Sequence, residues 1–150
     1  MSSKSRNKGG KWERDLKKLF EEFTEVPWER VRGSGAFDKK GDIYPAYDSF
    51  PFVIEAKHTE NWNFHDFLKH QGIILNTWWP KICEECKQAG NRLPMLICKK
   101  NYIPPIICLN KQGVTKLKIN KTTDRFIYQN KIYVFRLEDV IKKSKGKHLI

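Results

Sequence analysis

The stretch Phe52-Val53-Ile54-Glu55-Ala56-Lys57 carries most of the information about the fold of this chain. Its continuous apolar start is typical of a strand in the middle of a sheet. Side chains two residues apart on a strand point to the same face, so Glu55 and Lys57 should emerge side by side. Burying an acid and an amine is costly unless they have partners. A divalent metal and a phosphate would supply those partners. The alternative is that the strand lies at the edge of the sheet, where Glu55 and Lys57 are solvated and form only a minor salt bridge.

Two further carboxylates could join this pair. Asp42 follows Gly41 and opens the preceding predicted strand, and Glu13 lies on a predicted helix. Asp42 and Glu55 on adjacent strands could share one Mg²⁺, a cation that prefers oxygen ligands and keeps several waters. Glu13 would add a third carboxylate or hold a ligand water, and Lys57 would orient or activate the attacking water. This is the equipment that phosphodiester hydrolysis requires.

Each of these residues also has a plainer interpretation. Asp42 could be an ordinary turn aspartate after a glycine. Glu13 could be an exposed helix residue beside Arg14 and Lys17. Asp48 is a rival metal ligand, although its place before Ser49 suits a turn.

Composition indicates one folded domain with a polyanionic partner. The chain has 150 residues, of which 39% are hydrophobic, enough for a proper core. We assign residues 9–150 to a single domain and the basic residues 1–8 to a flexible N-terminal arm. Lys and Arg number 29 against 17 Asp and Glu, a net charge of +12. This balance favours DNA, RNA or an acidic membrane surface as the partner.

The cellular compartment follows from what the sequence lacks. No segment approaches the roughly 18 apolar residues of a membrane span, and the N-terminus has no signal-peptide hydrophobic region. We therefore expect a cytoplasmic protein with no membrane partner, whose cysteines stay reduced. Cys83 and Cys86 form a C-x-x-C pair, but it falls in a helical stretch and no second pair matches it. This favours small buried side chains over a structural zinc site.

Hydrophobic periodicity predicts a mixed α/β sheet with helices packed on it. A first helix has an apolar face with helical spacing, and a later helical region should be kinked or split by Pro80. Adjacent Trp78 and Trp79 favour the core and a dimer interface over stacking on unpaired bases. The predicted helices cover residues 10–23, 64–88 and 137–143, and the predicted strands cover 42–44, 52–57, 95–98, 106–109, 126–128 and 132–135.

Asp42 followed by Glu55-Ala56-Lys57 matches the D…(E)xK core of the PD-(D/E)xK nuclease superfamily. The wider pattern resembles the archaeal-type Holliday junction resolvases, which also occur in bacteriophages. The resemblance covers about the first seventy residues, and the remainder fits only in its order of helices and strands. Gly41 departs from the pattern, because a proline usually precedes the aspartate. The matching residues are Lys8-Gly9-Gly10-Lys11, Glu13, Arg32-Gly33-Ser34-Gly35, Asp42, Glu55 and Lys57.

The resemblance implies a restriction-endonuclease-like core, with a central mixed β-sheet flanked by helices. It implies metal binding by Glu13, Asp42 and Glu55, a catalytic Lys57, and a Ser34 that approaches the scissile phosphate. The cofactor would be Mg²⁺ or Mn²⁺, with no small-molecule organic cofactor. A homodimer would cut four-way DNA junctions symmetrically in DNA recombination and repair, in a host cell where the gene is carried by a phage.

Basic residues near this site are expected to hold DNA through its phosphates, without reading its sequence. No zinc finger or helix-turn-helix is recognisable, which favours recognition of DNA shape. Two alternatives stay open: a restriction-like or repair nuclease acting on duplex or flap DNA, and a non-catalytic basic DNA-binding protein. The candidate phosphate contacts are Lys8, Lys11, Arg30, Arg32, Lys39 and Lys40.

Overall fold

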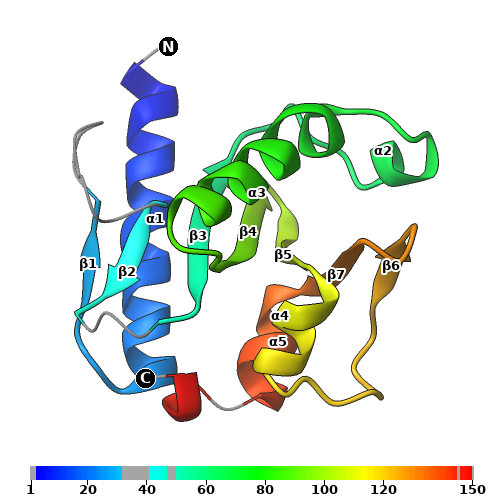
Figure 1. Cartoon of the computed structure of the whole chain (residues 1–150). Coiled ribbons are helices and arrows are strands. Elements are labelled where there is room, and N and C mark those ends of the chain that lie inside the picture. Colours follow the sequence, from blue (N-terminus) through cyan, green and yellow to red (C-terminus); the bar gives the residue numbers. More distant parts are fainter. Residues whose placement is uncertain (1–2, 32–40, 47–49, 145, 150) are drawn as a thin grey trace.

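The computed structural model describes residues 3–31, 41–46, 50–144 and 146–149. Seven strands form one sheet in the order β1-β2-β3-β4-β5-β7-β6 (Figure 1). Only β3 and β4 pair in parallel, and every other neighbouring pair is antiparallel. This confirms the predicted mixed sheet. The strands are β1 (Trp28–Arg30), β2 (Ile43–Pro45), β3 (Phe52–His58), β4 (Leu93–Lys100), β5 (Ile103–Leu109), β6 (Phe126–Tyr128) and β7 (Ile132–Arg136).

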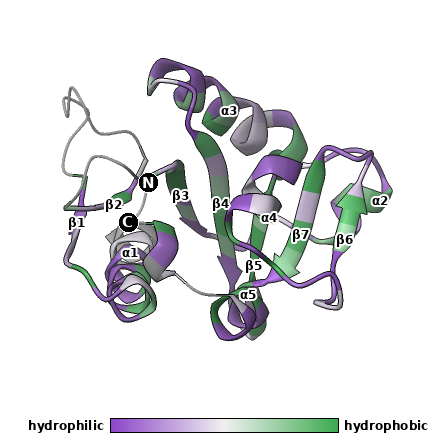
Figure 2. Cartoon of the chain, turned by 60° about the horizontal axis from the view of Figure 1, so that its bottom comes forward, coloured by the Kyte–Doolittle hydropathy of each residue, from purple (hydrophilic) through white to green (hydrophobic). Residues whose placement is uncertain are grey.

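Helices cover both faces of the sheet and form a hydrophobic core on each. Successive residues of a strand point alternately into the two cores. On one face Ile54 packs with residues of α1, α4 and α5. On the other face Val53 packs with residues of α2, η1 and α3. Figure 2 shows α3 on one side of the sheet and α1 and α5 on the other. The helices are α1 (Ser3–Thr24), α2 (His65–Leu68), the π-helical η1 (Ile74–Trp78), α3 (Trp79–Gln88), α4 (Lys111–Lys116), α5 (Leu137–Lys143) and the 3₁₀ turn η2 (Lys147–Leu149).

The first helix starts earlier than the sequence predicted. It begins at Ser3, so Ser3–Lys8 is helical where we expected a flexible arm. The face formed by Trp12, Leu16 and Phe20 is buried against the sheet. Because helix formation is cooperative, a firmly packed segment extends its helix into neighbouring polar residues at little further cost. None of the helices that the structure describes is long and apolar enough to cross a membrane.

The predicted helical region 64–88 is divided, but the division lies before residue 74 and not at Pro80. His70 and Gly72 take positive φ angles of 53° and 100° and separate α2 from η1, which continues directly into α3. Pro80 does not kink a helix but lies in the first turn of α3, where its missing N–H costs nothing. The short α4 was not predicted. It is capped by Asn110, whose side chain accepts a 2.8 Å hydrogen bond from the Gly113 N–H.

The prediction for the C-terminal half succeeded where the apolar pattern was regular. The β6–β7 hairpin and α5 lie where the sequence placed them. Strand β5 begins at Ile103 and therefore includes Pro104 and Pro105. These prolines are tolerated because they lie at an irregularity in the pairing with β4, between the Cys98–Ile106 and Lys100–Ile103 pairs, and because β7 pairs only with residues 106–109.

Candidate active site

Asp42 lies where β2 and β3 separate. The two strands share one paired position, Ile43 with Ile54, and the Asp42 N–H donates a 2.7 Å hydrogen bond to the Ile54 carbonyl. Beyond this point the hydrogen bond to β3 is made by the Asp42 side chain in place of the backbone. Asp42 Oδ2 accepts the Ala56 N–H at 2.7 Å. Burial raises the pKa of Asp42, while this hydrogen bond opposes the rise. The β3 strand thus holds the carboxylate in one orientation.

Glu55 and Lys57 leave β3 on the same face, as the period of two predicted. This face is the one covered by η1 and α3, since it is also the face of Val53. Burial and the neighbouring Asp42 raise the pKa of Glu55 to about 9. The positive charge of Lys57 acts in the opposite direction, because it lowers the pKa of Asp42 and the pKa of Glu55. The three side chains therefore form one electrostatic unit.

Glu85 of α3 is a fourth member that the sequence analysis missed. Its carboxyl group is hydrogen-bonded to Glu55 and raises the pKa of that residue. In α3 the buried residues are Ile82 and Cys86, and Glu85 lies beside them on the same side of the helix. A charged residue within an apolar helix face was the signal that could have identified it. The sequence alone did not show that this face covers Glu55.

Glu13 approaches from α1 and is already paired. Its Oε1 accepts hydrogen bonds from Arg30 Nη2 at 3.0 Å and from Arg30 Nε at 3.3 Å. Burial and the Asp42 charge raise the pKa of Glu13, and Arg30 and Lys57 oppose that rise. Glu13 is therefore close enough to Asp42 for the two charges to interact. Its hydrogen bonds with Arg30 fix the position of the Glu13 side chain.

A cleft of ≈ 940 Å³ leads to these groups between the start of α1 and the end of β3. Trp78 forms part of its wall, and Lys57 Nζ lies 5.6 Å from the centroid of the Trp78 ring. Trp78 is buried, which confirms its predicted place in the core. It also ends the π-helical η1, a rare geometry that is frequent at functional sites. The other lining residues are Lys8, Gly9, Gly10, Glu13, Arg30, Ala56, Lys57, His58, Thr59, Glu60, Asn61 and Ile73.

Comparisons with known proteins show the family to which the chain belongs. Residues 4–150 match the family described as "Phage putative PDDEXK endonuclease". The chain belongs to this family. Protein D14 of Escherichia phage T5 is 30% identical over 161 aligned positions, which cover 95% of this chain and 100% of that protein. The protein is thus a nuclease of the PD-(D/E)xK superfamily, as its D…ExK residues predicted.

One solved structure is a more distant match. The Holliday junction resolvase Hjc of Archaeoglobus fulgidus has a TM-score of 0.42 and 14% sequence identity, over 94% of this chain and 98% of that chain.

The donor set of this endonuclease suits a hard divalent cation. Among the residues that the structure describes, no three His, Cys, Asp or Glu side chains form a group arranged to hold a metal. Mg²⁺ does not need such a cage, because it is commonly held by one or two carboxylates and several waters. Asp42 and Glu55 are hydrogen-bonded carboxyl groups whose pKa values are both raised by burial. Asp42 and Glu55 are the residues that would hold such a cation, and its charge would relieve that cost.

The predicted phosphate contacts of the endonuclease fall into three groups. Lys8 and Arg30 line the cleft, but Lys8 pairs with Glu60 at 2.8 Å and Arg30 pairs with Glu13. Lys11 is exposed and lies 3.4 Å from Asp15. The remaining candidates, Ser34, Arg32, Lys39 and Lys40, lie outside the described residues.

The cysteines of the endonuclease pack as small apolar side chains, in agreement with the sequence analysis. Cys86, Cys98 and Cys108 are buried in the core between the sheet and α3, and Cys83 is half-buried beside them. Burial raises the pKa of Cys86 and of Cys108 to about 12. Thiolates are the reactive form, so buried thiols of this kind are inert.

Thiol labelling should therefore distinguish one cysteine from the others. In the native protein at pH 8 we expect a disulfide reagent to modify Cys83 first and the other three only on unfolding. Mass spectrometry of tryptic peptides measures the order. Rapid labelling of Cys98 or Cys108 under native conditions would contradict the packing described above.

Proposed function

We propose that the protein is a metal-dependent, structure-specific endonuclease that hydrolyses phosphodiester bonds in four-way DNA junctions. The observation that carries the catalytic part is the convergence of Asp42, Glu55 and Lys57, beside a cleft that Lys57 and Glu13 line. The junction as substrate is supported by the motif pattern of residues 8–57. The proposed cofactor is Mg²⁺ or Mn²⁺, held by Asp42 and Glu55 with Glu13 as a third ligand or the holder of a ligand water.

The proposed chemistry assigns a distinct task to each residue. Asp42 is kept in place by the Ala56 N–H, so its carboxylate needs little reorganisation to act as a ligand. Lys57 lies beside both carboxylates and would orient the attacking water. When bound, the divalent cation would activate that water and neutralise charge on the phosphate. Arg30 fixes Glu13 and adds positive charge to the wall along which the DNA backbone would pass.

Symmetric cutting of a junction requires two active sites related by a two-fold axis. A homodimer supplies them, and we include this assembly in the proposal. The net charge of +12 supports binding to a folded, highly charged nucleic acid.

The experiment compares a labelled immobile four-way junction with its linear duplex arms, in Mg²⁺ and in EDTA. We expect paired symmetric nicks in the junction and at least about tenfold slower cutting of the duplex. An Asp42→Asn variant, purified in parallel, should not cut and so controls for contaminating nucleases. Equal cutting of both substrates would replace the junction with duplex DNA as substrate. Binding without cleavage in Mg²⁺ and in Mn²⁺ would contradict the catalytic proposal.

A further inference from the structure

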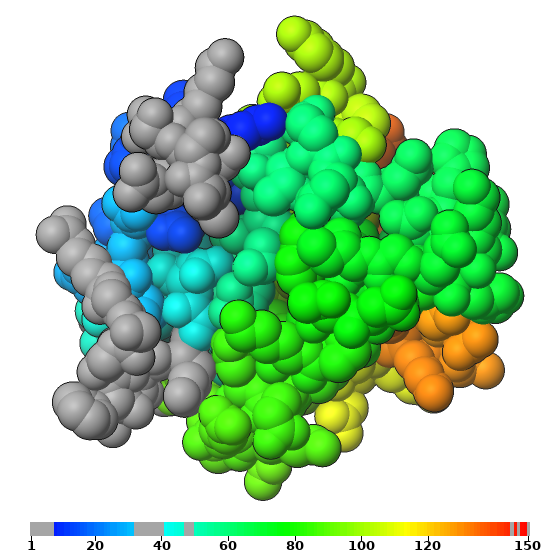
Figure 3. Space-filling view, turned by 90° about the horizontal axis from the view of Figure 1, so that it is seen from above, coloured from blue at the N-terminus to red at the C-terminus, as the bar shows by residue number. Residues whose placement is uncertain are grey.

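The turn between β4 and β5 presents an unusually exposed aromatic side chain. We name residues Lys100–Ile103 the hairpin tip. Tyr102 has a relative exposure of 104%, and Ile103 next to it is 47% exposed. In Figure 3 this segment, yellow-green at the upper margin, projects beyond the elements around it. An isolated exposed side chain is normal, but a fully exposed tyrosine beside a second apolar residue suggests a contact surface.

The backbone of the hairpin tip is held in an unfavourable conformation. Tyr102 has a φ of 65°, in the left-handed region that glycine or asparagine usually occupies in turns. A residue with a Cβ pays about 1–2 kcal/mol there. Such a conformation persists only where the surroundings impose it, and it often accompanies a functional side chain.

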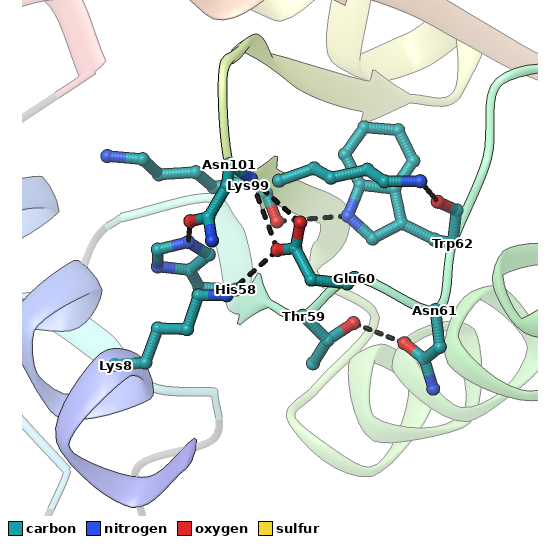
Figure 4. Close-up of polar contacts among 9 residues, drawn as sticks. Lys8, His58, Thr59, Glu60, Asn61, Trp62, Lys99 and Asn101 are labelled. Atoms are coloured by element: carbon teal, nitrogen blue, oxygen red, sulfur yellow. Dashed lines mark hydrogen bonds and ion pairs between the residues drawn. The ribbon is translucent and has the colours of Figure 1, made fainter. Parts of the chain in front are cut away.

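The surroundings that impose it connect the hairpin tip to the catalytic strand (Figure 4). Glu60, which follows β3, accepts the Asn101 N–H at 3.1 Å. The Asn101 side chain also lies 3.1 Å from His58 Nε2, at the end of β3. Trp62 is bonded to the same turn twice, since its Nε1–H donates to the Lys99 carbonyl at 3.0 Å and its own carbonyl accepts from Lys100 Nζ at 2.9 Å. The tip is therefore fixed relative to the active site.

Strand register places the tip close to the reacting groups. Lys57 pairs with Cys98 across the parallel β3–β4 ladder, and Tyr102 follows four residues later. At about 3.3 Å per residue, Tyr102 lies at most roughly 13 Å beyond Cys98 along the strand. This corresponds to about four nucleotides at 3.4 Å each. The cleft that contains Lys57 also contains His58 and Glu60, so the anchors of the tip form part of the cleft wall.

The chemistry of this surface favours nucleic acid over protein. The ammonium groups of Lys8, Lys99 and Lys100 surround the anchors of the tip, and phosphates are attracted to such clusters. An aromatic ring at the end of a basic surface is the arrangement that proteins use to stack on an unpaired base. A base inside an intact duplex is already stacked on both sides and offers no face to such a ring.

We propose that Tyr102 stacks on a base that is exposed at a branch or a gap in the DNA, and so helps to select branched over linear DNA. This inference rests on the proposed function, in which DNA is cut at the cleft. The anchored hairpin tip would set the distance between the exposed base and the phosphate that is cut.

Binding measurements with Tyr102→Ala test the proposal. Fluorescence anisotropy in EDTA, in which no cutting is expected, gives the affinity for a four-way junction, a gapped duplex and an intact duplex. We expect Tyr102→Ala to weaken binding to the junction and to the gapped duplex by about tenfold. Binding to the intact duplex should change by less than about twofold. Tyr102→Phe keeps the ring and should behave as wild type.

The control is Ile127→Ala, which removes an exposed apolar side chain from β6, and it should leave all three affinities unchanged. The proposal is overturned if Tyr102→Ala binds all three substrates as wild type does, or loses affinity for all three equally. It is also overturned if Tyr102→Ala changes the oligomeric state on sedimentation and leaves DNA affinity unchanged, because the tip would then serve a second copy.

The same data separate this inference from the proposed function. If wild type binds junction and duplex equally while Tyr102→Ala still loses about tenfold on the gapped duplex, the stacking role stands without the junction. Preferential cutting of junctions by Tyr102→Ala, at wild-type affinity, would leave the proposed function intact and remove the stacking role.

Discussion

Glu55→Gln is expected to abolish cleavage and, at the same time, to stabilise the metal-free protein at pH 8. The amide is a poor ligand for Mg²⁺ compared with a carboxylate, and the variant keeps the shape of the side chain. Loss of charge at this position should lower the rate of DNA cleavage by at least about 10²-fold. A single-turnover assay with excess protein measures that rate independently of product release. Affinity for DNA in EDTA at pH 8 should be unchanged, because Glu55 is mostly protonated in the folded, metal-free protein and the amide removes no charge.

The gain in stability follows from the protonation of Glu55. In the folded, metal-free protein the pKa of Glu55 is raised to about 9 from its ordinary value of 4.5. The stabilising contribution of the protonated form is therefore complete below about pH 4.5 and is lost as pH rises through about 9. At 1.36 kcal/mol per pH unit the loss by pH 8 is at most about 5 kcal/mol. We expect about 2 kcal/mol, because water that reaches the carboxylate relieves part of the cost.

Glutamine avoids this cost altogether. Its NH₂ group has two donors and could serve both Asp42 and Glu85, the two carboxyl groups to which Glu55 is hydrogen-bonded. Urea unfolding in EDTA at pH 5 and at pH 8 measures the free energy of unfolding. The advantage of the variant should be small at pH 5 and grow toward pH 8. Addition of Mg²⁺ should stabilise wild type more than the variant. A variant less stable than wild type at pH 8 in EDTA would contradict this account.

The sequence predicted the placement of these side chains well where that placement depends on local geometry. Glu55 and Lys57 share a face because strand periodicity requires it, and Asp42 reaches β3 because β2 is its neighbour in the sheet. Glu85 could not be found in the same way. Its contact with Glu55 depends on how the crossover between β3 and β4 places α3, and that placement results from the packing of Ile82 and Cys86. Long-range packing of this kind leaves only a weak trace in one sequence.

The errors in secondary structure have similar causes. Residues 64–88 carry apolar residues at helical intervals, but His70 and Gly72 adopt positive φ and divide the region. Nothing in the identity of His70 requires a left-handed conformation, so tertiary contacts decide it. One such contact is the 3.0 Å hydrogen bond between His70 Nδ1 and the hydroxyl of Tyr128, on β6. Elements that are stabilised by their own periodicity, such as α5, were predicted correctly.

Gly41→Ala is expected to destabilise the protein by about 2–5 kcal/mol and to impair cleavage as well. Gly41 has a φ of 87°, and a Cβ there would lie 2.4 Å from the Ile54 carbonyl oxygen and 2.9 Å from the Ile54 nitrogen. The unfavourable backbone conformation costs about 1–2 kcal/mol, and overpacking against the backbone adds about 1–3 kcal/mol. Proline, which usually precedes the aspartate in the resolvases that the sequence resembles, fixes φ near −65° and would fit no better.

Gly90→Ala is the matched control, because Gly90 has a similar φ of 82° but no atom within 4 Å of the added Cβ. It should lose only about 1 kcal/mol. The difference in the free energy of unfolding between the two variants therefore isolates the close approach of β2 to β3.

The same approach positions Asp42, whose N–H and Oδ2 both bond to β3. A shift of about 1 Å can cost 10²-fold in rate. Gly41→Ala should thus cut DNA slowly even at temperatures where it is fully folded, whereas Gly90→Ala cuts at the wild-type rate. Equal losses of stability in the two variants, or full activity in folded Gly41→Ala, would show that Asp42 does not depend on this contact.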